Sequence, residues 1–336
     1  MKNGITRQPL GATMMLFSLL LSLFVWRHLA VEKVAVVSGA APFGSAIGPW
    51  FAMRPYAGSA VTVILIFLTA LVLTRLISRN LVFPARTYVF LIFFVIAGYG
   101  IFATLGSVSV VLATYLAAKA SESFASAFRR SARMSKSFQG AMLLGIAPLL
   151  HAPAAVYALL VPLAMAVYIR GWRETLVAIV GLALPAATYS YIMWAFGVQA
   201  FGAYFTALGE SLFTPVSAGG GFPTVSLTSP TEVAVVALVV FMAAAVVLSL
   251  GAYVLEARRI RTRALRIYVY MALFMFVGVG GLLLPCASTA DVPLLALPLS
   301  VVAAGYFSRH TNLAAGILYV LTILAAVAYN LMILKS

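Results

Sequence analysis

Four side chains of this 336-residue sequence are of types that could carry chemistry in an otherwise apolar chain. Glu32 is a carboxylate of the kind that acts as a general base or a metal ligand. Arg54 carries a guanidinium, whose fork of donors matches a phosphate group. His151 is a titratable group inside an apolar stretch, which indicates function when that stretch lies in a membrane. We predict a catalytic role for Glu32 and binding of substrate or lipid phosphate by Arg54, His151 and Glu210, with no metal site and no cofactor.

Each of the first two residues also has a structural alternative. Glu32 is followed directly by Lys33 and lies near Arg27, so it is alternatively an ion-paired carboxylate of an interfacial loop. Arg54 lies close in sequence to Trp50 and Tyr56. The alternative for Arg54 is therefore an interfacial anchor in an aromatic belt.

Three further residues have alternatives of the same kind. His151 is alternatively a neutral imidazole that hydrogen-bonds backbone carbonyls freed by neighbouring prolines. Glu210 lies in a segment, 204–213, that we expect to form a helix on the outer leaflet, and it is alternatively part of that helix's solvated face. Asp291 is expected to cap a helix that begins near Pro293.

The composition identifies the class of protein that must position these residues. The chain is 64% hydrophobic and 9% charged, with a mean hydropathy of +1.09. No soluble domain of this length can bury so much apolar surface, so we expect an all-α, polytopic transmembrane helical bundle that forms a single domain, 1–336. The first apolar run is followed by Arg27 and His28 and not by a small-residue cleavage site, so it is interpreted as a retained helix.

Apolar segments predict about nine full crossings and one broken pair of short helices. The crossings are expected at 10–26, 59–77, 87–104, 108–118, 175–194, 233–255, 268–284, 293–307 and 313–334. A first external loop is expected at 27–57 and a second external segment at 197–230. Between Lys119 and Lys136, Phe124 and Phe128 indicate a helix on the membrane surface.

The stretch from Gly140 to Glu174 is apolar and is interrupted by Pro148, Pro153 and Pro162. If it crossed once, Arg170 and the arginines 258–266 would lie outside. If it enters and returns as two helices over 140–169, only four of the 22 basic residues lie outside, namely Arg27, Lys33, Arg54 and Lys335. The positive-inside rule favours the second topology, with the N-terminus cytoplasmic and the C-terminus external. Each half has about 15 residues, roughly 22 Å, so we expect His151 to lie within the membrane or just under its outer face.

The same region resembles the C-superfamily (GT-C) of membrane glycosyltransferases. Gly145, Ile146 and Ala147 match the start of a motif of that superfamily, and His151 lies where its lysine would be. Arg170 to Arg173 match its basic turn. Segment 138–194, with W-R-E at 172–174, also resembles an uncharacterised family of bacterial integral-membrane proteins. These resemblances imply a GT-C-like fold and transfer of a sugar from a polyprenyl-phosphate donor in envelope glycan assembly.

The sequence also departs from the GT-C pattern. Members of that superfamily place one or two carboxylates in the first external loop, where they activate the acceptor or bind a divalent metal. Here that loop contains only Glu32, and Gly106 and Ser107 stand where an Asp is expected after the third helix. The resemblance therefore implies either different chemistry or a non-catalytic relative.

The sequence argues against nucleic-acid binding and several motif-based enzyme classes, and it allows two alternatives to a transferase. The net charge of +15 comes from short loops, which indicates contact with membrane lipids and argues against nucleic acid. Cys286 is the only cysteine, so no internal disulfide forms, and there is no P-loop, zinc motif or G-x-S-x-G. Besides a transferase, the sequence allows a transporter or flippase for an amphipathic solute, or a structural subunit of an envelope complex. The sequence does not identify the sugar or its acceptor, a partner protein or the oligomeric state.

Overall fold

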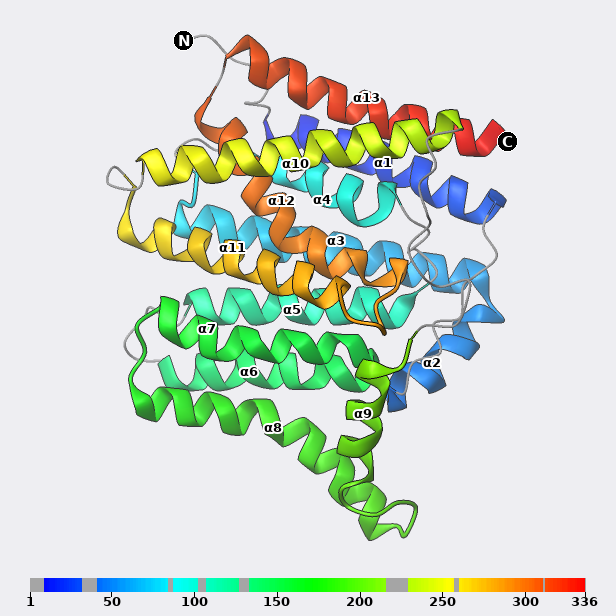
Figure 1. Cartoon of the computed structure of the whole chain (residues 1–336), viewed down its shortest axis with the longest axis vertical. Helices are drawn as coiled ribbons and strands as arrows, with labels where there is room; N and C mark the ends of the chain where they lie inside the picture. The colour runs from blue at the N-terminus through cyan, green and yellow to red at the C-terminus, as the bar shows by residue number, and fades with distance from the viewer. Residues whose placement is uncertain are drawn as a thin grey trace.

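The computed structural model describes residues 9–31, 41–83, 87–101, 107–126, 133–215, 229–256, 260–310 and 312–335. Within these ranges every regular element is a helix, as predicted (Figure 1). In chain order the elements are α1 (Leu10–Val31), α2 (Pro42–Ala52), α3 (Pro55–Asn80), α4 (Val89–Val95), the π-helix η1 (Ile96–Gly100), α5 (Val108–Ser126), α6 (Arg133–Leu150), the 3₁₀-helix η3 (Ala152–Leu159), α7 (Leu160–Val167), α8 (Trp172–Ala195), α9 (Ala203–Phe213), α10 (Pro230–Glu256), α11 (Thr262–Leu282), the 3₁₀-helix η5 (Thr289–Asp291), α12 (Val292–Arg309) and α13 (Leu313–Lys335).

Seven of the described helices are long and apolar enough to cross a membrane: α1, α3, α8, α10, α11, α12 with η5, and α13. The predicted crossing near 87–104 is a shorter apolar helix, Val89–Gly100, that combines α4 with η1. Long apolar helices of this number are the arrangement of a multi-pass membrane protein, because a helix satisfies its own backbone hydrogen bonds in lipid.

Helix α12 lies at the centre of the bundle, packed against α4, α5, α10 and α11. Of its most apolar 18-residue window, 83% is buried inside the protein, against 17% for the corresponding window of α8 at the edge. The close approach of α10 to α12 requires Gly305, because a Cβ there would lie 2.4 Å from Ser249 Oγ. Helix α4 is buried over its whole length.

The proline-broken stretch is a helical hairpin in the structure. Helix α6 ends at Leu150, His151 is extended with φ −152° and ψ 109°, and η3 with α7 runs back beside α6 (Figure 1). Helix α6 has 18 residues, about 27 Å. In the returning arm eight residues are 3₁₀ and eight are α-helical, which gives about 28 Å because the 3₁₀ rise is larger. Both arms are therefore longer than predicted and approach the roughly 30 Å of a hydrocarbon core.

The turn between α7 and α8 lies at the same end of the bundle as the starts of α6 and α11 (Figure 1). Ser137 of α6 donates a hydrogen bond to Glu174 of α8, with 2.6 Å between oxygens, and the ring of Tyr168 lies 5.6 Å from that of Tyr270 in α11. We call this the arginine end, because it carries Arg133, Arg170 and Arg266. The opposite end, at the tip of the hairpin, is the His151 end.

Three local predictions need correction. Helix α1 continues to Val31, so Arg27 lies within it and is buried, not in a loop. The predicted loop 27–57 contains helix α2, while residues 32–40 lie outside the described ranges. Phe124 is not on a membrane surface: α5 continues to Ser126, and Phe124 is buried where a Cβ on Gly140 would lie 2.9 Å from its ring. Phe128 lies outside the described residues.

Candidate functional site

His151 lies at the break between α6 and η3 and is buried with 2% of its side chain exposed. Pro153 follows two positions later and lacks the amide proton that a continuing α-helix would use. The extended backbone of His151 separates α6 from η3. Its Nε2 pairs with Oδ1 of Asp291 in a short, buried contact. The histidine therefore connects the tip of the hairpin to the beginning of α12.

Asp291 accepts more than this one bond. Its Oδ2 accepts the backbone N–H of Ser288 at 2.7 Å and the Ser288 hydroxyl at 3.2 Å, which completes a capping box over η5. The predicted role as a cap is thus present, but it serves η5, and no side-chain bond caps α12 itself. The N-terminus of α12 also favours negative charge. Ser288-x-x-Asp291 is a capping-box pattern in the sequence, but nothing local indicated that His151 would pair with it.

The loop that precedes Ser288 adds Cys286 to this buried cluster. Burial raises the pKa of the Cys286 thiol, and the negative charge of Asp291 raises it further. The thiol is therefore protonated at neutral pH and is a poor nucleophile. In the cluster of His151, Asp291 and Ser288, both carboxylate oxygens of Asp291 have a hydrogen-bond partner.

Arg54 lies at the start of α3 with its side chain exposed. Its guanidinium carbon lies 4.4 Å from the ring centroid of Trp50, a cation–π contact. Among the described residues no carboxylate pairs with it. The aromatic contact fits an interfacial anchor, and the exposed guanidinium is accessible to a phosphate.

Glu210 lies in the last turn of α9, which confirms the predicted helix, and its side chain is exposed. Its backbone carbonyl accepts the N–H and the hydroxyl of Thr214, at 3.0 and 2.8 Å. In the part of the chain that the structure describes, the Glu210 carboxylate makes no ion pair. Glu32 lies outside that part, so its predicted role remains a prediction.

The helices near Arg54, His151 and Glu210 pack close to one another, although among the described residues these three side chains are not bonded to each other. A Cβ on Gly44 of α2 would lie 2.2 Å from the carbonyl oxygen of Leu150, next to His151. Helix α9 packs against η3. The ring of Tyr189 in α8 lies 5.3 Å from that of Tyr204 in α9 and 5.9 Å from that of Phe43 in α2, so it connects α9 with α2. Within the described residues, however, no hydrogen bond or ion pair joins Arg54 or Glu210 to His151.

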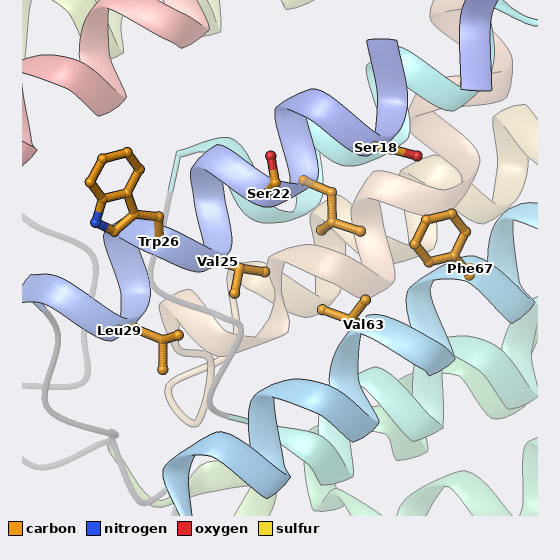
Figure 2. A pocket seen from close by; sticks show the side chains of 8 residues that line it. Ser18, Ser22, Val25, Trp26, Leu29, Val63 and Phe67 are labelled. Atoms are coloured by element: carbon orange, nitrogen blue, oxygen red, sulfur yellow. The ribbon is translucent and has the colours of Figure 1, made fainter. Parts of the chain in front are cut away.

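An apolar groove of about 490 Å³ lies between α1 and α3 (Figure 2). It is lined by Ser18, Leu21, Ser22, Val25, Trp26, Leu29, Val63 and Phe67. The hydroxyls of Ser18 and Ser22 donate to Met14 O at 2.9 Å and Leu19 O at 2.8 Å, so both are satisfied within α1. The groove therefore presents hydrocarbon, which suits an apolar chain and not a polar solute.

Sequence reasoning missed a second polar site, around Arg27. Arg27 has 1% of its surface exposed, and its Nη1 donates to Gly100 O at 3.3 Å. Asn330 donates to the same carbonyl at 2.9 Å, and Tyr329 donates to Ile101 O at 2.9 Å. These side chains from α1 and α13 satisfy carbonyls at the end of the π-helix η1. The signal in the sequence that could have indicated this site is Arg27 itself, an arginine directly after the apolar run 10–26.

Among the described residues no three His, Cys, Asp or Glu side chains are grouped so that they could hold a metal ion. Comparisons with protein families, with curated proteins and with solved structures found no match.

Proposed function

We propose that this chain is a multi-pass protein of the bacterial inner membrane that binds a polyprenyl-phosphate-linked sugar and transfers the sugar in envelope glycan assembly. The positive-inside rule would place the arginine end in the cytoplasm and the His151 end outside. The N-terminus would then be cytoplasmic and the C-terminus external.

One observation carries this proposal: the apolar groove between α1 and α3 lies on the helix whose start bears the exposed Arg54. Val63 is nine positions after Arg54, a distance of about 13 Å along the helix. A prenyl chain in the groove would therefore bring its phosphate toward Arg54. Glu32, in the segment that joins α1 to α2, would act as the base on the acceptor, as the sequence predicts.

Binding is tested with the purified chain by native mass spectrometry, using a polyprenyl phosphate and a short-chain alkyl phosphate. Arg54→Ala should weaken binding of both by roughly tenfold, because it removes a charged hydrogen bond. Val63→Trp, which fills the groove, should weaken only the polyprenyl compound. Arg75→Ala removes another exposed arginine of α3 and is the matched control. Equal binding by all four proteins would refute the lipid-phosphate site.

Catalysis is tested separately with Glu32→Gln. Loss of a general base lowers a rate by roughly 10²–10⁴-fold and leaves binding largely intact. We therefore expect sugar transfer from the lipid-linked donor to fall by that factor while polyprenyl phosphate still binds. Normal transfer by Glu32→Gln would exclude the proposed base.

A non-catalytic structural subunit is the second candidate, and the filled interior favours it. Large side chains such as Phe90, Phe93 and Phe307 are fully buried around α12. Binding of polyprenyl phosphate without any transfer activity in the wild type would favour this candidate. The same filled interior gives no support to the transporter or flippase alternative.

A further inference from the structure

Three arginines from three different elements converge at the arginine end. Arg133 is the first residue of α6, Arg170 lies in the turn between α7 and α8, and Arg266 lies in the second turn of α11. None of them belongs to the groove or to the His151 cluster.

Arg170 pairs with a carboxylate that is also bonded to α6, the helix that begins at Arg133. Glu174 accepts a hydrogen bond from Ser137 at 2.6 Å, and its Oε1 lies 3.4 Å from Arg170 Nη1. Arg133 is four residues before Ser137 on α6, so it occupies the same helix face one turn earlier. Ser137 on that face bonds Glu174, the partner of Arg170. The side chain of Arg170 is only 4% exposed.

Arg266 approaches the same turn from α11. It lies four residues before Tyr270, which contacts the ring of Tyr168 at 5.6 Å. The same helical spacing therefore places Arg266 beside the turn that holds Arg170.

The electrostatics of Arg170 agree with this convergence. Burial lowers the pKa of Arg170, Glu174 opposes that effect, and the positive charges of Arg133 and Arg266 lower the pKa further. Because a guanidinium does not release its proton in proteins, the cluster remains cationic.

The described carboxylates at this end cannot balance the cluster. Glu174 is shared by Arg170 and Ser137. Glu122 pairs with Lys119 at 2.5 Å and lies 4.0 Å from Arg79, while Glu256 pairs with Arg309. Of the three arginines, Arg170 pairs with Glu174, and no other described carboxylate pairs within the cluster. The cluster therefore keeps a net positive charge that an anion from outside the chain would neutralise.

We propose that the cluster of Arg133, Arg170 and Arg266 binds the phosphate of an anionic phospholipid headgroup. The site lies where α7 ends at Val167 and the apolar helix α8 begins at Trp172. Trp172 is 69% exposed, as is typical of a tryptophan at a membrane interface. Arginine binds phosphate with paired, charge-assisted hydrogen bonds, which suits a headgroup at that level.

The test measures thermal unfolding of the purified full chain in neutral detergent with added phosphatidylglycerol, phosphatidylcholine or inorganic phosphate. Phosphatidylglycerol should raise the Tm of the wild type, and phosphatidylcholine should not. The double variant Arg133→Gln/Arg266→Gln should lose this shift, with the concentration needed for half the effect rising at least roughly tenfold. Arg170 is left intact because it pairs with Glu174.

The matched control is Arg75→Gln/Arg261→Gln, which removes two exposed cations outside the cluster. It should keep the phosphatidylglycerol shift. An equal loss in both double variants would overturn the site in favour of diffuse attraction. An equal shift with inorganic phosphate would overturn the assignment to a lipid. A test of prenyl-phosphate binding at Arg54 is independent of these outcomes.

Discussion

The partner of His151 is the main finding at the scale of single residues. A buried imidazole bonded to a buried carboxylate is stable only because each group satisfies the other and Ser288 supplies two further donors. Asp291 serves three donors, whereas His151 makes one described side-chain bond. The two residues should therefore differ in what their loss costs.

We expect Asp291→Ala to lower the free energy of unfolding by about 3–5 kcal/mol, because it leaves His151 and the Ser288 amide unpaired in a buried site. His151→Ala should cost less, about 1–3 kcal/mol, because Asp291 keeps both bonds from Ser288. Unfolding by denaturant in detergent measures both. The double variant should cost less than the sum, since the two residues share one interaction. Strict additivity would contradict the contact.

At the scale of elements, apolar length predicted most helices closely. The expected crossings at 175–194, 233–255 and 313–334 correspond to α8, α10 and α13, with ends that differ by a few residues. The predictions were less good where an element is short or unusually buried. Helix α2 lies in an expected loop, and α5 runs past Lys119 because Glu122 compensates that charge.

Packing between elements depends on glycines that sequence patterns do not single out. Gly305→Ala should destabilise the chain by about 1–3 kcal/mol, because its Cβ would lie 2.4 Å from Ser249 Oγ and 2.8 Å from Tyr253. Gly280→Ala in α11 is the matched control, since a Cβ there meets nothing within 4 Å. The control should be neutral or stabilising by up to about 1 kcal/mol. Melting temperatures of the two variants decide the comparison, and equal losses would refute the close approach.

At the scale of the whole molecule, the hairpin of α6, η3 and α7 determines which ends of later helices share a side. Ser137 with Glu174 and Tyr168 with Tyr270 connect the ends of four helices at the arginine end. The turns that carry Arg133, Arg170 and Arg266 therefore lie at one end of the bundle, and the positive-inside rule would assign that end to one compartment.

Topology is testable by cysteine labelling in a Cys286→Ser background. In the wild type we expect Cys286 to label poorly at neutral pH, because burial and the charge of Asp291 raise the pKa of its thiol. Its removal therefore serves only to exclude background labelling. Arg173→Cys should react only with a reagent that enters the cytoplasm, and Met53→Cys, at a position that is 83% exposed, should react with an impermeant one. Labelling of Arg173→Cys from outside would overturn the proposed orientation.

The sequence by itself determined the all-helical class and the position of most long helices. These follow from the length of apolar runs and from the charges between them, which are local properties of the chain. Only the tertiary structure decided that His151 meets Asp291, 140 positions away, and that Arg27 meets Gly100. It also decided that Arg133 and Arg266 lie close enough to Arg170 to act on it electrostatically. Such contacts depend on which helices become neighbours, and in an apolar chain many arrangements bury similar surfaces, so the pattern of hydrophobic residues does not select among them.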